Sequence, residues 1–453
     1  MYIQKAEIKN IRSIVDFEIE FKNPAGWHVL IGDNGAGKTT IVRSMALALA
    51  GNESQGLRAN WEEWLKKKSD AGQIWVDLNV DKSIDIYEFY VLDKPSHKYK
   101  KDKSIDFKVL NRRLAFSRGE SEVNVEEKTY LDNNLSLDEK RDSYGSFGSD
   151  YRFKFSGYFS VAYGPYRRFE GGSSEWDELF KNKNFARLAA HLSVFGEDIA
   201  LTEVTSWLKD LNYKSLEKNE ESEYALENLK KLINYEDEDG SFLPHNTSFE
   251  TVNSDGVFFK DGNGTIISVN QMSDGYRSIL SMTFELIRQL VRVYSSELVF
   301  KNIEKGEMFI DLPGVVLVDE IDAHLHPTWQ TRIGQWFLKY FPKLQFIVTT
   351  HSPLVCRAAE NGSIWRLAAP GSDEKSGEIT GLDRERLIYG NVLDAYGTEV
   401  FGTNVAISEE SVKKQEILAK LSKKKMLDDI SPDEEAKLDN LKKVFTTDAP
   451  IEL

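Results

Sequence analysis

The sequence contains a single cysteine, Cys356, among its 453 residues. A framework of internal disulfide bonds needs at least two cysteines, so the class of small cross-linked secreted domains is excluded. No apolar run approaches the roughly 18 residues that a membrane-spanning helix needs, and the first residues lack the apolar core of a signal peptide. We therefore expect a cytoplasmic protein without a membrane partner.

Basic residues are scarce relative to acidic ones. Lys and Arg together number 58 and Asp and Glu number 73, which gives a formal net charge of −15. This surplus of negative charge argues against indiscriminate binding to nucleic acid, although a local basic groove is compatible with it. With 41% hydrophobic residues, the chain is long enough for two or three domains, or for one large domain with insertions.

Residues 32–40 carry the clearest chemistry in the chain. They fit the phosphate-loop spacing G-x-x-x-x-G-K-[ST], between an apolar run at 27–31 and a helical pattern at 40–50. Glycines let several backbone N–H groups point at one anion, a lysine adds positive charge, and a threonine hydroxyl can reach Mg²⁺. The residues that we expect to bind nucleotide here are Gly32, Asn34, Gly35, Gly37, Lys38, Thr39 and Thr40.

The pattern of apolar residues predicts the organisation around this loop. Strands are expected at 3–9, 14–21, 73–80 and 84–92, in an antiparallel sheet beside the nucleotide. The lysines at 98, 100, 101 and 103 either lie in a solvated loop or contact nucleic acid. The predicted parts are a first lobe (1–118), a flexible insertion (119–150), a strand and loop (151–169), a helical insertion (170–250), a second lobe (251–370) and a helical add-on (371–453).

The second lobe contains three further motifs. Ser273 and Gly275 precede a helical pattern at 278–294, after a hairpin at 256–269. An apolar run at 314–318 ends in Asp319 and Glu320, where the first carboxylate can hold Mg²⁺ together with Thr39 and the second can activate a water. Another apolar run ends at His351, which can hydrogen-bond a terminal phosphate.

Two histidines and an aromatic stripe have simpler interpretations than a ligand site. His324 and His326 lie close to Asp322, but their spacing beside a proline favours a loop over a transition-metal site. The stripe at helical spacing indicates core packing. Its members are Trp329, Ile333, Trp336, Phe337 and Tyr340.

Taken in order, these motifs resemble the ATP-binding-cassette heads of the SMC, RecF and OLD group of ATPases. The resemblance implies an α/β P-loop NTPase fold, a mixed sheet flanked by helices with helical insertions, and ATP and Mg²⁺ as cofactors. It implies Arg12 as a further nucleotide contact, and Ser273 and Gly275 as contacts to ATP on the phosphate loop of a second copy, so that a homodimer or higher homo-oligomer forms. The glutamine that relatives place at the end of a lobe-one strand is not evident, and residues 163–167 occupy its place.

The segment after His351 has no visible nuclease site, because its acidic residues are scattered. A capping box at 431–434 predicts the start of a helix with Leu438, Leu441 and Phe445 on one stripe. This add-on either packs on its own head or docks a partner. The whole layout resembles the ATPase subunit of two-gene bacterial anti-phage systems of the Septu type, whose partner is an HNH nuclease.

The resemblance implies an ATP-binding, ATP-hydrolysing regulatory or scaffold subunit. Such a subunit would control a partner nuclease of the HNH type through nucleotide-dependent dimerisation. The first alternative is a RecF-like DNA-repair ATPase that clamps DNA directly. The second is a head that binds nucleotide without turning it over.

Overall fold

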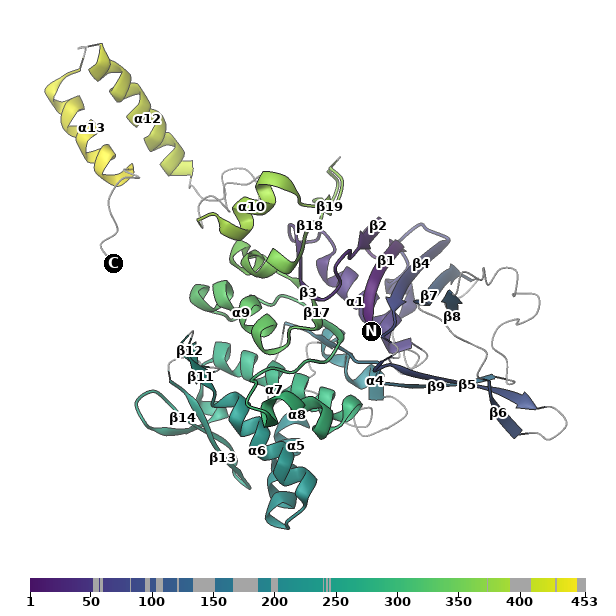
Figure 1. Cartoon of the computed structure of the whole chain (residues 1–453). Helices are drawn as coiled ribbons and strands as arrows, with labels where there is room; N and C mark the ends of the chain where they lie inside the picture. The colour runs from purple at the N-terminus through teal and green to yellow at the C-terminus, as the bar shows by residue number, and fades with distance from the viewer. Residues whose placement is uncertain are drawn as a thin grey trace. The chain divides into compact units, whose positions relative to one another are not determined.

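The computed structural model describes residues 1–51, 57, 60–81, 83–93, 98–102, 109–119, 122–132, 151–165, 186–196, 203–238, 240–241, 243, 246–372, 374–391, 409–427 and 430–445. The chain divides into two compact units, Met1–Tyr389 and Gly390–Leu453 (Figure 1). No described helix combines the length and the apolar character that crossing a membrane requires.

A six-stranded sheet lies at the centre of the larger unit, in the order β10-β16-β17-β3-β18-β19. The first five strands are parallel neighbours, and β19 pairs antiparallel with β18. The strands are β10 (Ser160–Tyr163), β16 (Gly314–Val318), β17 (Leu344–Thr349), β3 (Gly26–Ile31), β18 (Gly362–Arg366) and β19 (Gly377–Glu378). Every residue of β3, β16 and β17 is buried, as expected for parallel strands that are covered on both faces.

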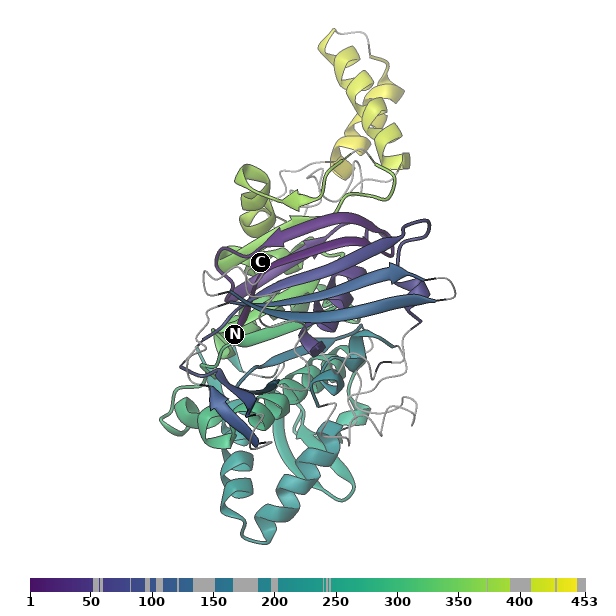
Figure 2. The same ribbon diagram turned by 90° about the vertical axis from the view of Figure 1, so that its right-hand side faces the viewer.

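A second, antiparallel sheet has the order β2-β1-β4-β7-β8 and is seen in purple and blue in Figure 2. Its strands are β1 (Tyr2–Ile11), β2 (Ile14–Glu20), β4 (Ala71–Asn79), β7 (Val109–Arg118) and β8 (Val123–Asp132). The first two of the predicted strands pair antiparallel as a hairpin, with Ile11 opposite Ile14 at its turn. Alternate residues of β4 are buried, because one face of this sheet covers the core.

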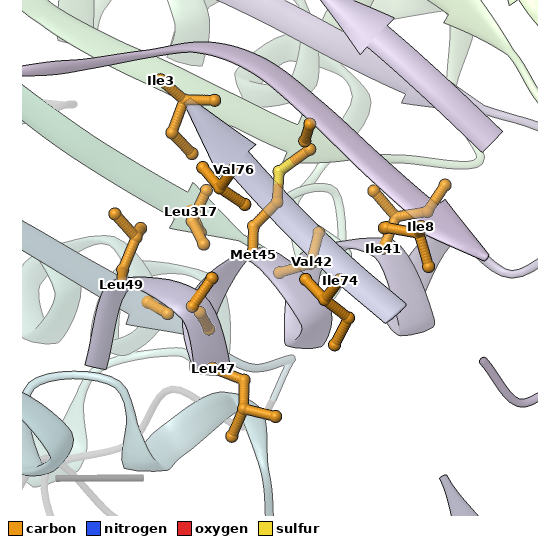
Figure 3. Packing of buried hydrophobic residues seen from close by; sticks show 14 of the residues in the cluster. Ile3, Ile8, Ile41, Val42, Met45, Leu47, Leu49, Ile74, Val76 and Leu317 are labelled. Atoms are coloured by element: carbon orange, nitrogen blue, oxygen red, sulfur yellow. The ribbon is translucent and has the colours of Figure 1, made fainter. Parts of the chain in front are cut away.

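Helix α1 (Lys38–Ala50) contacts strands of both sheets. Ile41, Val42 and Met45 on this helix are fully buried among side chains from β1, β4 and β16, such as Ile3, Val76 and Leu317 (Figure 3). Burial of each such side chain contributes on the order of 2 kcal/mol. The helix that begins in the phosphate loop is therefore held firmly by the main core.

Three sequence-based expectations for the region after β4 differ from the structure. The predicted strand at 84–92 forms as β5 (Ile86–Asp93), but it pairs with β6 (Lys98–Asp102) and β9 (Tyr151–Ser156) in a separate sheet. The flexible insertion was predicted from residue 119, yet β8 pairs with β7 along its whole length. Alternating residues in β8 were too polar to reveal the strand. The lysines at 98, 100 and 101 lie on β6 and not in a loop, whereas residues 133–150 and Lys103 lie outside the described residues.

Two packed helices, α5 (Glu203–Leu216) and α6 (Glu220–Ile233), lie within the predicted helical insertion. A three-stranded sheet follows, made of β13 (Ser248–Asn253), β14 (Gly256–Lys260) and β15 (Ile266–Ser268). It leads into α7 (Asp274–Tyr294), which starts one turn earlier than predicted, then α8 (Ser296–Glu304) and α9 (Pro327–Tyr340). The aromatic stripe of α9 is core packing, since Ile333, Phe337 and Tyr340 are buried.

The larger unit also contains short helices, strands and 3-10 helices. They are α4 (Ala186–Ala189), α10 (Gly381–Tyr389), β11 (Glu236–Asp237), β12 (Gly240–Ser241) and the 3-10 helices η2 (Trp61–Glu63), η5 (Leu192–Val194), η6 (Val269–Gln271) and η7 (Pro353–Asn361).

The smaller unit contains the helical hairpin of α12 (Glu409–Met426) and α13 (Pro432–Phe445). The predicted capping box is present, because the N–H of Glu434 donates to the Ser431 hydroxyl and the Glu434 carboxylate accepts from the Ser431 N–H. Leu438 on the predicted stripe is fully buried.

Candidate nucleotide site

Four chain segments meet at one edge of the central sheet. Because β3, β10, β16 and β17 are parallel, their carboxyl ends lie together, and ligands of open α/β sheets bind at this edge. The register places Tyr163 beside Val318, Val318 beside Val348, and Val348 beside Val29. The phosphate loop, Asp319 with Glu320, and His351 each follow one of these strands directly. The three motifs are therefore neighbours in space.

The phosphate loop has the backbone that its glycines allow. Gly35 and Gly37 have φ angles of 81° and 99°, a region that favours glycine. Gly37 is also the N-cap of α1 and has no side chain to satisfy the first N–H groups of the helix. Those groups and the positive end of the helix dipole suit an anion. Asn34 and Gly35 are exposed at the turn of the loop, and Thr39 and Thr40 lie in the first turn of α1.

Lys38 is held in place by the loop itself. Its ammonium group donates to the carbonyl oxygens of Gly32 at 2.7 Å and Asp33 at 3.1 Å. Burial lowers the pKa of Lys38, and the nearby carboxylates of Asp319 and Glu320 oppose that shift. The ammonium group therefore lies within electrostatic reach of the carboxylates that follow β16, as a site for phosphate and a divalent cation requires.

Thr349, at the end of β17, forms hydrogen bonds with both Asp319 and Glu320. Its hydroxyl donates a 2.6 Å hydrogen bond to Oδ1 of Asp319 and accepts a 2.7 Å hydrogen bond from the backbone N–H of Glu320. Asp319 is almost completely buried, and Glu320 has a φ of 48°, which is unusual for a residue with a side chain. The hydroxyl thus fixes one carboxylate and stabilises the strained backbone of the next residue.

A second threonine orients the segment that contains His351. The Thr350 hydroxyl donates to Oδ1 of Asp322 at 2.6 Å, and the backbone N–H of His351 donates to the same oxygen at 3.4 Å. His351 itself is exposed. Sequence reasoning assigned no role in the site to Thr349, Thr350 or Asp322. The signal was weak, since threonine is common in strands and only the register reveals which carboxylate each hydroxyl reaches.

The segment with Ser273 and Gly275 borders a different surface. Ser273 is the N-cap of α7, yet its side chain makes no capping hydrogen bond. It lines a hollow of about 510 Å³ together with residues from the β14–β15 turn and the start of α7, and no lining residue comes from the phosphate loop. A Cβ on Gly275 would lie 2.8 Å from the carbonyl oxygen of His324, so this glycine lets α7 approach the loop after Glu320.

Arg12 lies in the turn between β1 and β2, close to α1. Its guanidinium group stacks 4.7 Å from the ring centroid of Trp64, and its backbone N–H donates to the Trp64 carbonyl. Burial lowers the pKa of Arg12, and the charge of Arg43 on α1 lowers it further. Ser13 and Ile14 of the same turn lie against Gly37 of the phosphate loop. The predicted contact of Arg12 with nucleotide stays a prediction.

The two histidines near Asp322 do not build a metal site in the described part of the chain, where no cluster of three or more His, Cys, Asp or Glu side chains suits a metal ion. His326 instead caps α9, because its Nδ1 accepts from the backbone N–H of Thr328 at 3.4 Å and also lies 2.9 Å from the Thr328 hydroxyl. His324 has a φ of 65° and belongs to the loop that touches Gly275.

The residues present fit ATP with Mg²⁺. A glycine-lined helix N-terminus and the Lys38 ammonium would hold the phosphates, and the Thr39 hydroxyl and the buried Asp319 carboxylate are the oxygen ligands that Mg²⁺ prefers. Glu320 and His351 follow the neighbouring strands β16 and β17, where a water and a terminal phosphate would be reached.

Comparison with known proteins finds several relatives that match parts of the chain. The chain is 26% identical over 412 residues to the Septu protein PtuA of Bacillus mycoides (strain KBAB4), covering 88% of this chain and 45% of that protein. It is 34% identical over 168 residues to the retron Ec83 probable ATPase of Escherichia coli, covering 37% of this chain and 29% of that protein. The chain thus spans less than half the length of the curated relatives it matches.

Among solved structures, an SMC head bound to the C-terminal winged-helix domain of ScpA matches with a TM-score of 0.44 and 17% identity, over 85% of this chain and 100% of that one. Residues 28–357, which contain the phosphate loop, Ser273, Asp319 and His351, match the family described as AAA domain, putative AbiEii toxin, Type IV TA system. The chain belongs to this family of P-loop ATPases.

Proposed function

We propose that the chain is an ATPase whose complete active site forms between two copies. The observation that carries the proposal is the convergence of Lys38, Asp319 and Glu320 at one sheet edge, with Ser273 bordering a surface to which the phosphate loop does not contribute. The Ser273 side chain makes no capping hydrogen bond to α7. Its hydroxyl and the first N–H groups of α7 therefore suit the phosphates of a nucleotide held by another copy.

The roles of the individual residues follow from their positions. Lys38 and the loop N–H groups bind the β- and γ-phosphates, while Thr39 and Asp319 hold Mg²⁺, which neutralises phosphate charge when bound. Glu320 orients and deprotonates the attacking water, and His351 donates to the γ-phosphate. Thr349 keeps Asp319 and Glu320 in the geometry that these tasks need.

The proposed biological role is that of a regulatory subunit in anti-phage defence. Its support is the similarity to proteins named Septu protein PtuA and retron probable ATPase. ATP-dependent association of two copies would be the switch, and a partner nuclease of the HNH type the controlled effector. A ligand that binds only the associated state shifts the equilibrium by its differential affinity for that state.

Nucleotide binding tests the first step of this proposal. Lys38→Ala should weaken ATP binding by roughly 100-fold or more, because the loop loses its charge-assisted hydrogen bonds to phosphate. Lys301→Ala on the exposed side of α8 is the matched control and should bind like the wild type. Titration with ATP by calorimetry measures both. Equal affinity of the two variants would refute the site.

Co-purification tests the proposed role. We expect a nuclease gene to lie beside the gene of this chain, and its product to bind the chain and change its cutting rate in an ATP-dependent manner. Salt-sensitive, ATP-dependent DNA binding by the chain alone would instead favour a DNA clamp.

A further inference from the structure

The last residue of β10, Tyr163, lies beside the candidate site in space. Its carbonyl oxygen accepts a 2.8 Å hydrogen bond from the backbone N–H of Asp319, and the two strands are in register up to Val318. Any displacement of this strand end therefore displaces the backbone of the Mg²⁺-binding carboxylate.

The side chain of Tyr163 faces the opposite direction, toward α7. Side chains alternate along a strand, and Ala162 belongs to the core around α1 whereas Tyr163 does not. Phe159 lies four residues earlier on the same face and packs against Tyr294 of α7, with ring centroids 6.1 Å apart. The Glu285 carboxylate of α7 is close enough to add to the effect of burial in raising the pKa of Tyr163.

The Tyr163 hydroxyl is completely enclosed and has no hydrogen-bond partner. An enclosed hydroxyl without a partner is rare in folded proteins and costs stability. α7 has an enclosed acceptor in the same condition, the Oε1 atom of Gln289. The Gln289 amide donates to Glu285 at 2.6 Å, and Arg288 holds both oxygens of that carboxylate.

The Tyr163 hydroxyl on β10 is a donor without an acceptor, and Oε1 of Gln289 on α7 is an acceptor without a donor. The two groups are therefore complementary. Ser273 lies at the start of α7, on the surface proposed to meet a second copy, so docking there would bear directly on this helix. A small shift of α7 along β10 would change which groups the Tyr163 hydroxyl meets. Packed helices do shift by about 1–2 Å in such transitions.

We propose that Tyr163 is a positioning residue that couples α7 to the nucleotide site: its hydroxyl gains an acceptor in the Gln289–Glu285 group of α7 when nucleotide joins two copies. The proposal rests on the ATP-dependent dimer of the proposed function. Docking of a second copy at Ser273 would thereby change the hydrogen bonding of Tyr163 and, through the end of β10, the position of Asp319.

A pair of tyrosine variants separates coupling from stability. Tyr163→Phe removes only the unsatisfied hydroxyl, so the melting temperature without nucleotide should rise by roughly 1–3 °C. The same variant should need about 5- to 10-fold more ATP for half-maximal dimerisation, because the dimer loses a hydrogen bond that the single chain never had. Tyr163→Phe is therefore expected to raise the melting temperature of the single chain and to weaken its ATP-dependent dimerisation.

Tyr294→Phe is the matched control, since its hydroxyl already donates to the Pro313 carbonyl at 2.8 Å. This variant should lower the melting temperature and leave ATP-dependent dimerisation unchanged. Light scattering over an ATP titration measures the dimer, and calorimetry measures the melting temperature. Unchanged dimerisation of Tyr163→Phe overturns the inference while leaving the proposed function intact, whereas absence of an ATP-dependent dimer in the wild type overturns both.

Discussion

Thr349 and Asp319 are joined by a 2.6 Å hydrogen bond between the ends of neighbouring parallel strands. The same hydroxyl accepts from the N–H of Glu320, so one side chain holds both halves of the carboxylate pair. Groups that orient a metal-binding carboxylate commonly matter nearly as much as the carboxylate itself. This threonine therefore provides the most direct test of how the site is organised.

Thr349→Val should reduce ATP hydrolysis by roughly 10- to 100-fold, because the variant keeps the shape of the side chain but loses both hydrogen bonds. ATP binding should change much less, since Lys38 and the phosphate loop are untouched. Steady-state hydrolysis and an ATP titration measure the two effects. Thr349→Ser keeps the hydroxyl and is the control. Equal loss in both variants would show that packing, and not the hydroxyl, matters.

Gly275→Ala should disturb the contact between α7 and the loop after Glu320. The added Cβ would approach the His324 carbonyl oxygen to 2.8 Å, closer than such atoms pack, so the loop must shift. We expect a lower melting temperature and at least a several-fold lower rate of ATP hydrolysis. Gly377→Ala is the control, because a Cβ there meets nothing within 4 Å. If both variants match the wild type, the loop does not link α7 to Glu320.

Burial of His28 predicts an acid-dependent loss of stability. Nδ1 of His28 lies 2.9 Å from the Ser363 hydroxyl and Nε2 lies 2.9 Å from the Pro24 carbonyl, while burial lowers its pKa to about 4. The folded state thus binds the proton less readily than the unfolded chain. The contribution of His28 to the free energy of unfolding is fully present above pH about 6.5. It falls as the pH drops toward 4, by roughly 1.4 kcal/mol per pH unit.

Denaturant unfolding between pH 7 and pH 5 checks this dependence. His28→Gln should be less stable at pH 7 and should show a shallower decline toward pH 5. His191, whose pKa burial also lowers to about 4, contributes a second increment of the same sign. Identical slopes for the wild type and for His28→Gln would contradict the assignment.

Ser431→Ala should destabilise the smaller unit alone. The variant removes the capping hydrogen bond to the N–H of Glu434, which typically contributes about 1 kcal/mol. Amide hydrogen exchange should become several-fold faster in α13 and stay unchanged in α1. Ser431→Asp retains a capping oxygen and should exchange like the wild type. Faster exchange in α1 as well would indicate that the effect of the substitution is not local.

The order of motifs in the sequence was sufficient to predict the sheet edge at which the site lies. Each motif is local: a glycine pattern dictates the phosphate loop, and an apolar run ending in Asp319 and Glu320 dictates a buried strand with carboxylates at its end. The capping box at Ser431 was predictable for the same reason.

Features that depend on long-range pairing were not predictable. The polar sequence of β8 is typical of a loop, and only its pairing with β7 makes it a strand. The residues around Ile86 do not indicate that β5 joins a different sheet from β4. The bridge by Thr349 depends on the register of β16 against β17, and the contact of Gly275 with His324 depends on tertiary packing. The unpaired hydroxyl of Tyr163 belongs to the same class.

The central claim is that each ATP site needs the phosphate loop of one copy and Ser273 of another. Mixing two inactive variants tests it most directly. Lys38→Ala keeps an intact Ser273 surface, and Ser273→Arg keeps an intact phosphate loop, so a mixed dimer contains one complete site. We predict that neither variant hydrolyses ATP alone and that an equimolar mixture recovers roughly a quarter of the wild-type rate, since half of the dimers are mixed and each has one of two sites. Hydrolysis at the wild-type rate by Ser273→Arg alone, or no recovery in the mixture, would contradict the claim.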